Sequence, residues 1–161
     1  MKNAVAKGFA KFGLLAVMTI IAVSASAKAQ SLEYRLTANI PFDFSVANKK
    51  FPAGKYWISR APQSNGDLVV QIRSTDGHSN ISRLTFPVVT NNPMSKGSLV
   101  FHRYGEEYFL SEIWPAAGLT GRELPKSRTE RDLVQKAQDS GIAAMNAPQA
   151  ETVTIRASNL P

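Results

Sequence analysis

Residues 34–46 read YRLTANIPFDFSV and alternate strictly between apolar and polar side chains. The even positions hold the apolar set, which comprises Tyr34, Leu36, Ala38, Ile40, Phe42, Phe44 and Val46. Successive side chains of a β-strand point to opposite faces, so a period of two predicts a strand with one face in the core. Pro41 has no N–H for a ladder hydrogen bond and therefore predicts two short strands, at 33–40 and 42–46.

Further short strands follow along the chain, with turn signals between them. The strands are expected at 55–60, 68–74, 81–90, 98–104, 107–114 and 152–156. The turn signals are Asn65-Gly66, Asp76-Gly77 and Gly105-Glu106. A two-residue turn with glycine first would place His102 opposite Phe109 in the hairpin that it closes. The pattern predicts an all-β fold, an antiparallel sandwich or barrel of about seven to eight strands.

One helix is expected before the last strand. Ser127, Arg128, Thr129 and Glu130 form an S-x-x-E capping box, which predicts a helix over about 127–138. Residues 116–125 are interpreted as a loop. Residues 139–150, rich in Ala, Asn, Pro and Gln, are interpreted as a mobile loop. Residues 30–161 are therefore expected to form a single β-rich domain.

The first 29 residues have the pattern of a signal peptide. Lys2, Lys7 and Lys11 precede an uncharged apolar run, and small residues follow with A-x-A patterns ending at Ala27 and Ala29. Either alanine can be the cleavage point. A membrane anchor is the rival interpretation, but the run is short for a spanning helix, which needs about 20 apolar residues. We expect an exported protein, periplasmic or extracellular, with no transmembrane span after cleavage.

Charge and cysteine content narrow the classes of function. The chain has 19 Lys plus Arg and 12 Asp plus Glu, a net charge of +7. Cleavage after Ala29 would remove four lysines and no acid, leaving 15 basic and 12 acidic residues and a net charge of +3. So small an excess argues against a nucleic-acid partner, which requires a clustered basic face. With no cysteine, stability must come from the core rather than from disulfides.

Several longer motifs resemble a known family. They are ANIPFDFSVANKKFPAGKY, QIRS, LVFHRYGEEYFLSEIW and GRELPKSRTER. Together they resemble a family of small exported proteins of soil bacteria, of unknown function, with the pattern PF-x-F-x-V, LPAG-x-Y, LVFHRYG-x-x-YFL and GRELPKS. The resemblance covers about residues 38–133, and Phe51 stands where the family more often has Leu. It implies an exported one-domain protein and adds no catalytic residues.

Few residues suit catalysis or metal binding. His78 and His102 are the two histidines, and no HExxH or His-x-His spacing occurs, so no metal site and no cofactor are expected. His102 and Glu112 are the weak catalytic candidates, because the hairpin would bring their strands together, with Ser111 beside them. A packed, hydrogen-bonded strand histidine is the simpler interpretation of His102.

Trp57 is the candidate ligand-binding residue. It alternates out of step with Tyr56 and Ile58, so it points outward if those two belong to the core. An exposed indole can stack on a sugar ring or on a partner. If both faces of the sheet are partly covered, Trp57 is instead an ordinary packed residue.

A basic group surrounds the expected helix start. It consists of Arg122, Lys126, Arg128 and Arg131, interspersed with the acids Glu123, Glu130 and Asp132. The mixture is typical of a solvated helix with ion pairs and not of a polyanion site.

These features favour an exported, non-catalytic binding or envelope-structural module. The sequence does not identify the ligand, and envelope or extracellular polysaccharide is the candidate partner, through Trp57. The alternative is a small hydrolase that acts on envelope or extracellular polymers, for which a carboxylate and a histidine within hydrogen-bond reach in a pocket would be the sign.

Overall fold

The computed structural model describes residues 35–61, 68–92, 95–139 and 150–159, with side chains described up to residue 136 in the helix. The chain divides into two compact units, residues 1–32 and 33–161, and every described residue belongs to the second. The predicted signal peptide therefore lies outside the described residues. So do residues 140–149 of the predicted mobile loop.

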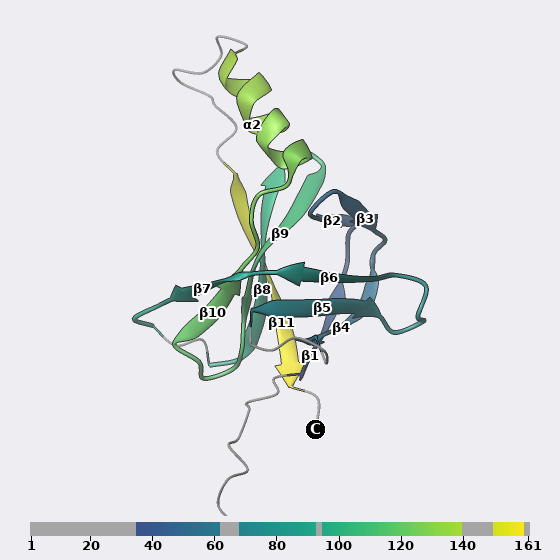
Figure 1. The fold of residues 1–161 in the computed structure, drawn as a ribbon, viewed down its shortest axis with the longest axis vertical. Coiled ribbons are helices and arrows are strands. Elements are labelled where there is room, and N and C mark those ends of the chain that lie inside the picture. Colours follow the sequence, from purple (N-terminus) through teal and green to yellow (C-terminus); the bar gives the residue numbers. More distant parts are fainter. Residues whose placement is uncertain (1–34, 62–67, 93–94, 140–149, 160–161) are drawn as a thin grey trace, which may run out of the picture. The chain divides into compact units, whose positions relative to one another are not determined.

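Eleven strands and one helix lie in the described part of the chain (Figure 1). The strands are β1 (Arg35–Ile40), β2 (Phe44–Val46), β3 (Lys49–Phe51), β4 (Gly54–Arg60), β5 (Val69–Ser74), β6 (Asn80–Leu84), β7 (Phe86–Val89), β8 (Gly97–Tyr104), β9 (Glu107–Trp114), β10 (Thr120–Glu123) and β11 (Glu151–Asn159). The helix is α2 (Arg128–Asp139). The prediction of an all-β fold with one helix before the last strand is confirmed.

The strand count exceeds the expected seven or eight for three local reasons. β3 was not expected. The predicted strand at 81–90 is divided into β6 and β7 at Thr85, whose N–H and hydroxyl both donate to the carbonyl of Leu68. The interpretation of 116–125 as a loop was wrong, because it contains β10, which pairs with β7 and β9.

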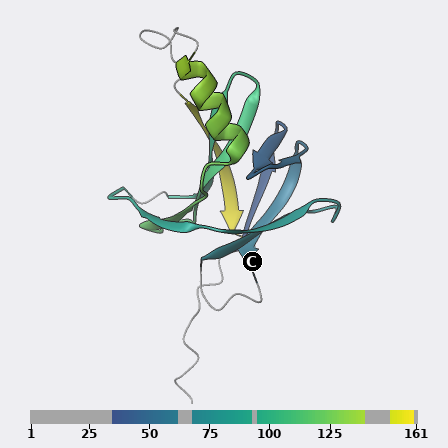
Figure 2. The same ribbon diagram turned by 45° about the horizontal axis from the view of Figure 1, so that its top comes forward.

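The strands form one sheet that curls without closing. Its order is β3-β2-β9-β8-β11-β1-β4-β5-β6, and β10 joins β9 to β7. All pairings are antiparallel except the short one between β2 and β9, so the sheet is mixed. β5 and β6 run across the direction of β8 and β11 (Figures 1 and 2). At the ends of the order, β3 and β6 are joined by a side chain, because Lys49 Nζ donates to the carbonyl of Asn80 at 3.0 Å.

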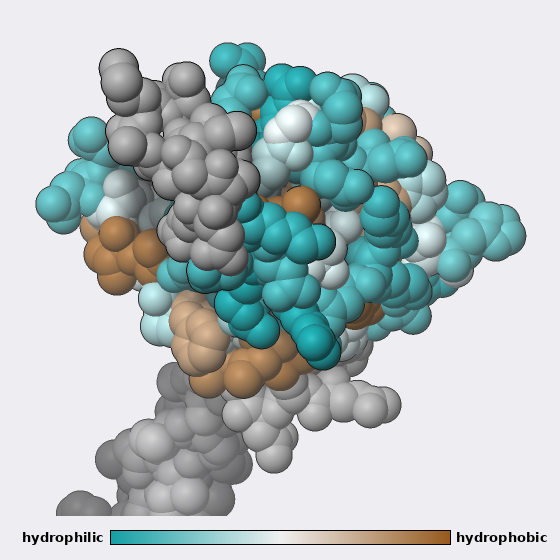
Figure 3. Space-filling model, turned by 90° about the horizontal axis from the view of Figure 1, so that it is seen from above, coloured by the Kyte–Doolittle hydropathy of each residue, from teal (hydrophilic) through white to brown (hydrophobic). Residues whose placement is uncertain are grey.

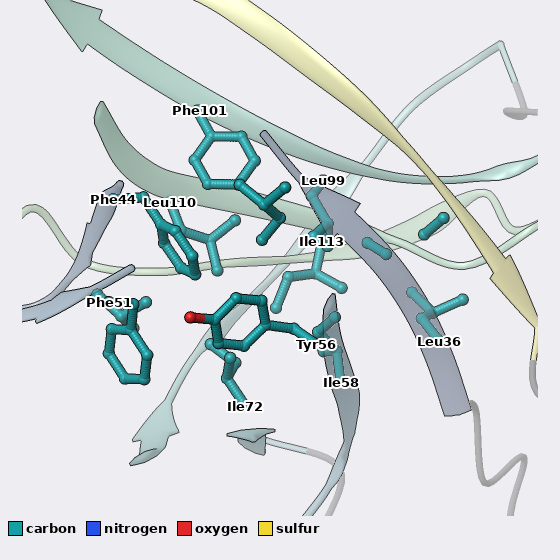
Figure 4. Close-up of a cluster of buried hydrophobic side chains, with 14 of the residues drawn as sticks. Leu36, Phe44, Phe51, Tyr56, Ile58, Ile72, Leu99, Phe101, Leu110 and Ile113 are labelled. Atoms are coloured by element: carbon teal, nitrogen blue, oxygen red, sulfur yellow. The ribbon is translucent and has the colours of Figure 1, made fainter. Parts of the chain in front are cut away.

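The core lies inside the curl and takes side chains from both halves of the sheet (Figure 4). Phe44 packs edge-on against Tyr56 and Phe101, with ring centroids 5.1 and 5.5 Å apart. The alternation in β1 is confirmed, since Ile40 is 1% exposed while Asn39 is exposed. Six large hydrophobic residues of the described part are exposed: Trp57, Leu68, Leu84, Phe86, Val89 and Leu119. Figure 3 shows one largely hydrophilic face with hydrophobic patches near its border.

The β8–β9 hairpin has the predicted register. His102 lies opposite Phe109, and Gly105 has a positive φ of 62° at the first central position of the turn. A bulge between Val100 and Phe101 leaves Ser111 as the extra residue of β9.

Candidate functional site

Trp57 lies on the outer face of the part of the sheet formed by β1, β4, β5 and β6. Its neighbours in the strand, Tyr56 and Ile58, are each 1% exposed and belong to the core. Trp57 itself is 39% exposed. The structure therefore has the strand phase that the sequence predicted, with the indole outside.

Polar side chains surround the indole on this face. Thr37 of β1 and Arg73 of β5 are the register partners of Trp57 on either side, and Asn80 of β6 lies opposite Arg73. Lys55 and Ser59 flank Trp57 along β4, on the same face because side chains alternate. A single aromatic ring among hydroxyl, amide and cationic groups suits a sugar, which offers an apolar ring face and hydroxyl groups at its edge.

A second polar cluster joins β8 to the first turn of α2. Glu130 is 4% exposed, and its Oε1 lies 2.9 Å from His102 Nδ1 and 3.4 Å from the Tyr104 hydroxyl. The helix start positions this carboxylate, because the Ser127 hydroxyl accepts a hydrogen bond from the Glu130 N–H. His102 is only partly covered, with 24% of its side chain exposed.

The structure does not pair the two weak catalytic candidates with each other. His102 contacts Glu130, while Glu112 accepts a 2.7 Å hydrogen bond from the indole N–H of Trp114. Ser111 is buried in the bulge, and its carbonyl accepts the N–H of Leu124. Among the described residues, no hydrogen bond therefore joins His102, Glu112 and Ser111 into a catalytic trio.

Glu130 is the residue that sequence reasoning missed. The capping-box motif located it correctly at the third helical position, and half of the box is formed. Among the described residues, however, its carboxylate makes no bond back to the Ser127 N–H and turns to His102 instead. No sequence spacing indicates that contact, because 28 residues separate the partners.

Tyr104 should make the stability of the protein change with pH in the alkaline range. Burial of the phenol, and then the nearby Glu130 charge, raise the pKa of Tyr104 above its usual 10. Between the unfolded and the folded pKa, the folded state binds more protons, so the free energy of unfolding falls as pH rises above about 10. We expect Tyr104→Phe to flatten this fall when denaturant unfolding is measured from pH 9 to 11.5. Equal slopes in the two proteins would contradict the assignment.

No group of three or more His, Asp or Glu that could hold a metal ion is found among the described residues. The described residues also include no helix that is long and apolar enough to cross a membrane. Comparisons of the chain with protein-family models, with curated proteins and with solved structures found no match.

Proposed function

We propose that the chain is an exported, non-catalytic binding module that holds an envelope or extracellular polysaccharide on its Trp57 face. The proposal includes membership of the exported soil-bacterial family that the motifs of the chain resemble. The single observation that carries it is the exposed indole between two core residues, at 39% against 1% exposure. Because both neighbours in the strand are buried, the indole is held on the outer face, where a ligand can stack on the exposed part of the ring.

The chemistry of the face supports a neutral or weakly acidic sugar polymer. Stacking on an indole contributes roughly 1 kcal/mol beyond the area that it buries. Arg73 and Lys55, both exposed, add donors without making the face strongly basic. A regular sheet holds these groups in fixed positions, so little ordering cost is expected on binding.

Trp57→Ala should abolish or greatly reduce retention of the protein on immobilised plant cell-wall or bacterial envelope polysaccharide. A loss of roughly 1 kcal/mol or more corresponds to about a fivefold to tenfold weaker interaction. The measurement is elution from the polysaccharide column, with circular dichroism to show that the fold is kept.

Phe86→Ala is the matched control for this experiment. Phe86 is an aromatic residue on β7 that is 52% exposed, so its removal deletes a similar apolar surface elsewhere. Retention should survive in this variant. If both variants lose retention equally, adsorption is a general hydrophobic effect and the Trp57 proposal fails.

The alternative is a small hydrolase, and one observation favours it. A carboxylate 2.9 Å from one ring nitrogen of a partly exposed histidine is the arrangement that orients a general base. In that case His102, aligned by Glu130, would activate water or a hydroxyl. Release of soluble fragments from the same polysaccharides, lost in His102→Ala, would replace the binding proposal with this one.

A further inference from the structure

A pocket lies where the curled sheet fails to close. It has a volume of about 330 Å³ and is formed by three separate segments: the turn between β2 and β3, the last residues of β6, and the start of α2. We call it the seam pocket. The side chains that matter for its chemistry are Asn48, Arg83, Lys126, Ser127, Arg128 and Arg131.

Four of these side chains are cations, and none of the described lining residues is an acid. Three come from the helix start, but Arg83 comes from β6, more than forty residues earlier in the chain. Like charges around one cavity repel one another, and this repulsion lowers stability unless an anion offsets it. All four side chains are exposed, so a small anion can reach them from solvent.

None of the three acids that are interspersed with the basic group in the sequence is among the described residues that line the seam pocket. Glu130 is buried against His102 and Tyr104. Asp132 reaches only Arg128, at 4.0 Å, with both side chains more than half exposed, and such pairs neutralise little. Arg131 donates to the backbone carbonyl of Lys126, which fixes its guanidinium without cancelling its charge.

We propose that the seam pocket binds the phosphate group of an anionic ligand. Three guanidinium groups and one ammonium offer many more donors than a carboxylate can accept, whereas a phosphate monoester carries close to two charges and three acceptor oxygens. Arginine forks match phosphate oxygens two at a time. The volume is at the low end of the range for small-ligand sites, which fits a phosphate with a small organic group attached.

The site goes beyond the polysaccharide function proposed above and depends on different residues. Its lining comes from β6 and the helix start, whereas Trp57 is on β4. Trp57→Ala should therefore leave phosphate binding unchanged, and failure of one proposal does not imply failure of the other.

Titration calorimetry with inorganic phosphate, at constant ionic strength, tests the inference on the folded protein. We expect saturable binding of one phosphate, and no comparable heat with acetate. Arg83→Gln and Arg131→Gln should each weaken binding about tenfold, because each removes charged hydrogen bonds to the anion. Arg73→Gln, which removes an equal charge from the outer face, should bind phosphate like the parent protein.

Arg83→Gln is the decisive variant, since it lies outside the helix start and cannot act by unwinding α2. If it binds phosphate as tightly as the Arg73→Gln control, or if acetate binds as well as phosphate, the inference is overturned. A second arm uses sedimentation with phosphatidic-acid vesicles to separate the sources of the phosphate group. Arg83-dependent binding of vesicles would indicate a lipid headgroup, and binding of soluble phosphate alone would indicate a free metabolite.

Discussion

Ile40→Asp is expected to unfold the protein, whereas Asn39→Asp should leave it folded. Ile40 is 1% exposed and lies opposite Gly54 in the β1–β4 ladder, facing the core. An aspartate there loses the buried isoleucine and adds an unpaired carboxylate out of reach of water, which together cost on the order of 4–5 kcal/mol or more. That is a large share of the roughly 5–15 kcal/mol that holds a domain together.

Asn39→Asp is the matched control one position away. Asn39 is exposed, and its register partner on β4 is Lys55, so a carboxylate there gains an opposite charge across the strands. Its effect should stay within about 0.5 kcal/mol. Denaturant unfolding followed by circular dichroism measures both variants. Similar losses for the two would mean that both faces of β1 are buried, against the exposure seen in the structure.

The same alternation explains why so much of the sheet could be predicted. All side chains on one face of a strand share one environment, so apolar and polar residues alternate along the sequence with a period of two. This is how the phase of Trp57 could be read from the chain, whereas the His102–Phe109 register followed from the two-residue Gly105-Glu106 turn. In β2 the rule fails, because Ser45 is buried as well as Phe44 and Val46, so neither face of this strand is exposed.

The candidate sites show which features a local sequence pattern does and does not predict. Trp57 was found because its signal is local, within one strand. Glu130 and Arg83 were not, because each depends on segments that are distant in sequence. Glu130 contacts His102, and Arg83 lines the same pocket as the helix start. A basic group can be counted in a sequence, but which of its neighbouring acids face away is decided only by the fold.

β10 was not predicted from the sequence for a related reason. The second substitution with a large expected effect lies in this strand. Its residues, TGRE, have no apolar alternation, because the strand packs through a glycine. Gly121 lies against the buried indole of Trp114, and a Cβ at this position would be 2.7 Å from two of the ring atoms. Only a glycine leaves room for the backbone of β10 to approach the Trp114 ring so closely. The indole fills the space that a side chain at position 121 would otherwise occupy.

Gly121→Ala should therefore destabilise the protein by about 1–3 kcal/mol, although alanine normally suits a strand better than glycine. The indole cannot swing away freely, since its N–H donates to Glu112 at 2.7 Å. Gly118→Ala is the matched control, because its Cβ would meet Pro115 only at an ordinary 3.4 Å. Denaturant unfolding of both variants should show a clear loss for position 121 and almost none for 118.

Trp114→Leu separates the steric cause from any effect of alanine on the backbone. This substitution costs stability of its own by leaving a cavity, but it also removes the ring atoms that the new Cβ would strike. In the Trp114→Leu background, Gly121→Ala should then cost much less than in the parent protein, giving a coupling energy of about 1 kcal/mol or more. Additive losses in the free energy of unfolding would show that alanine at position 121 destabilises the protein for a reason other than contact with the indole. The packing explanation of this strand would then have to be abandoned.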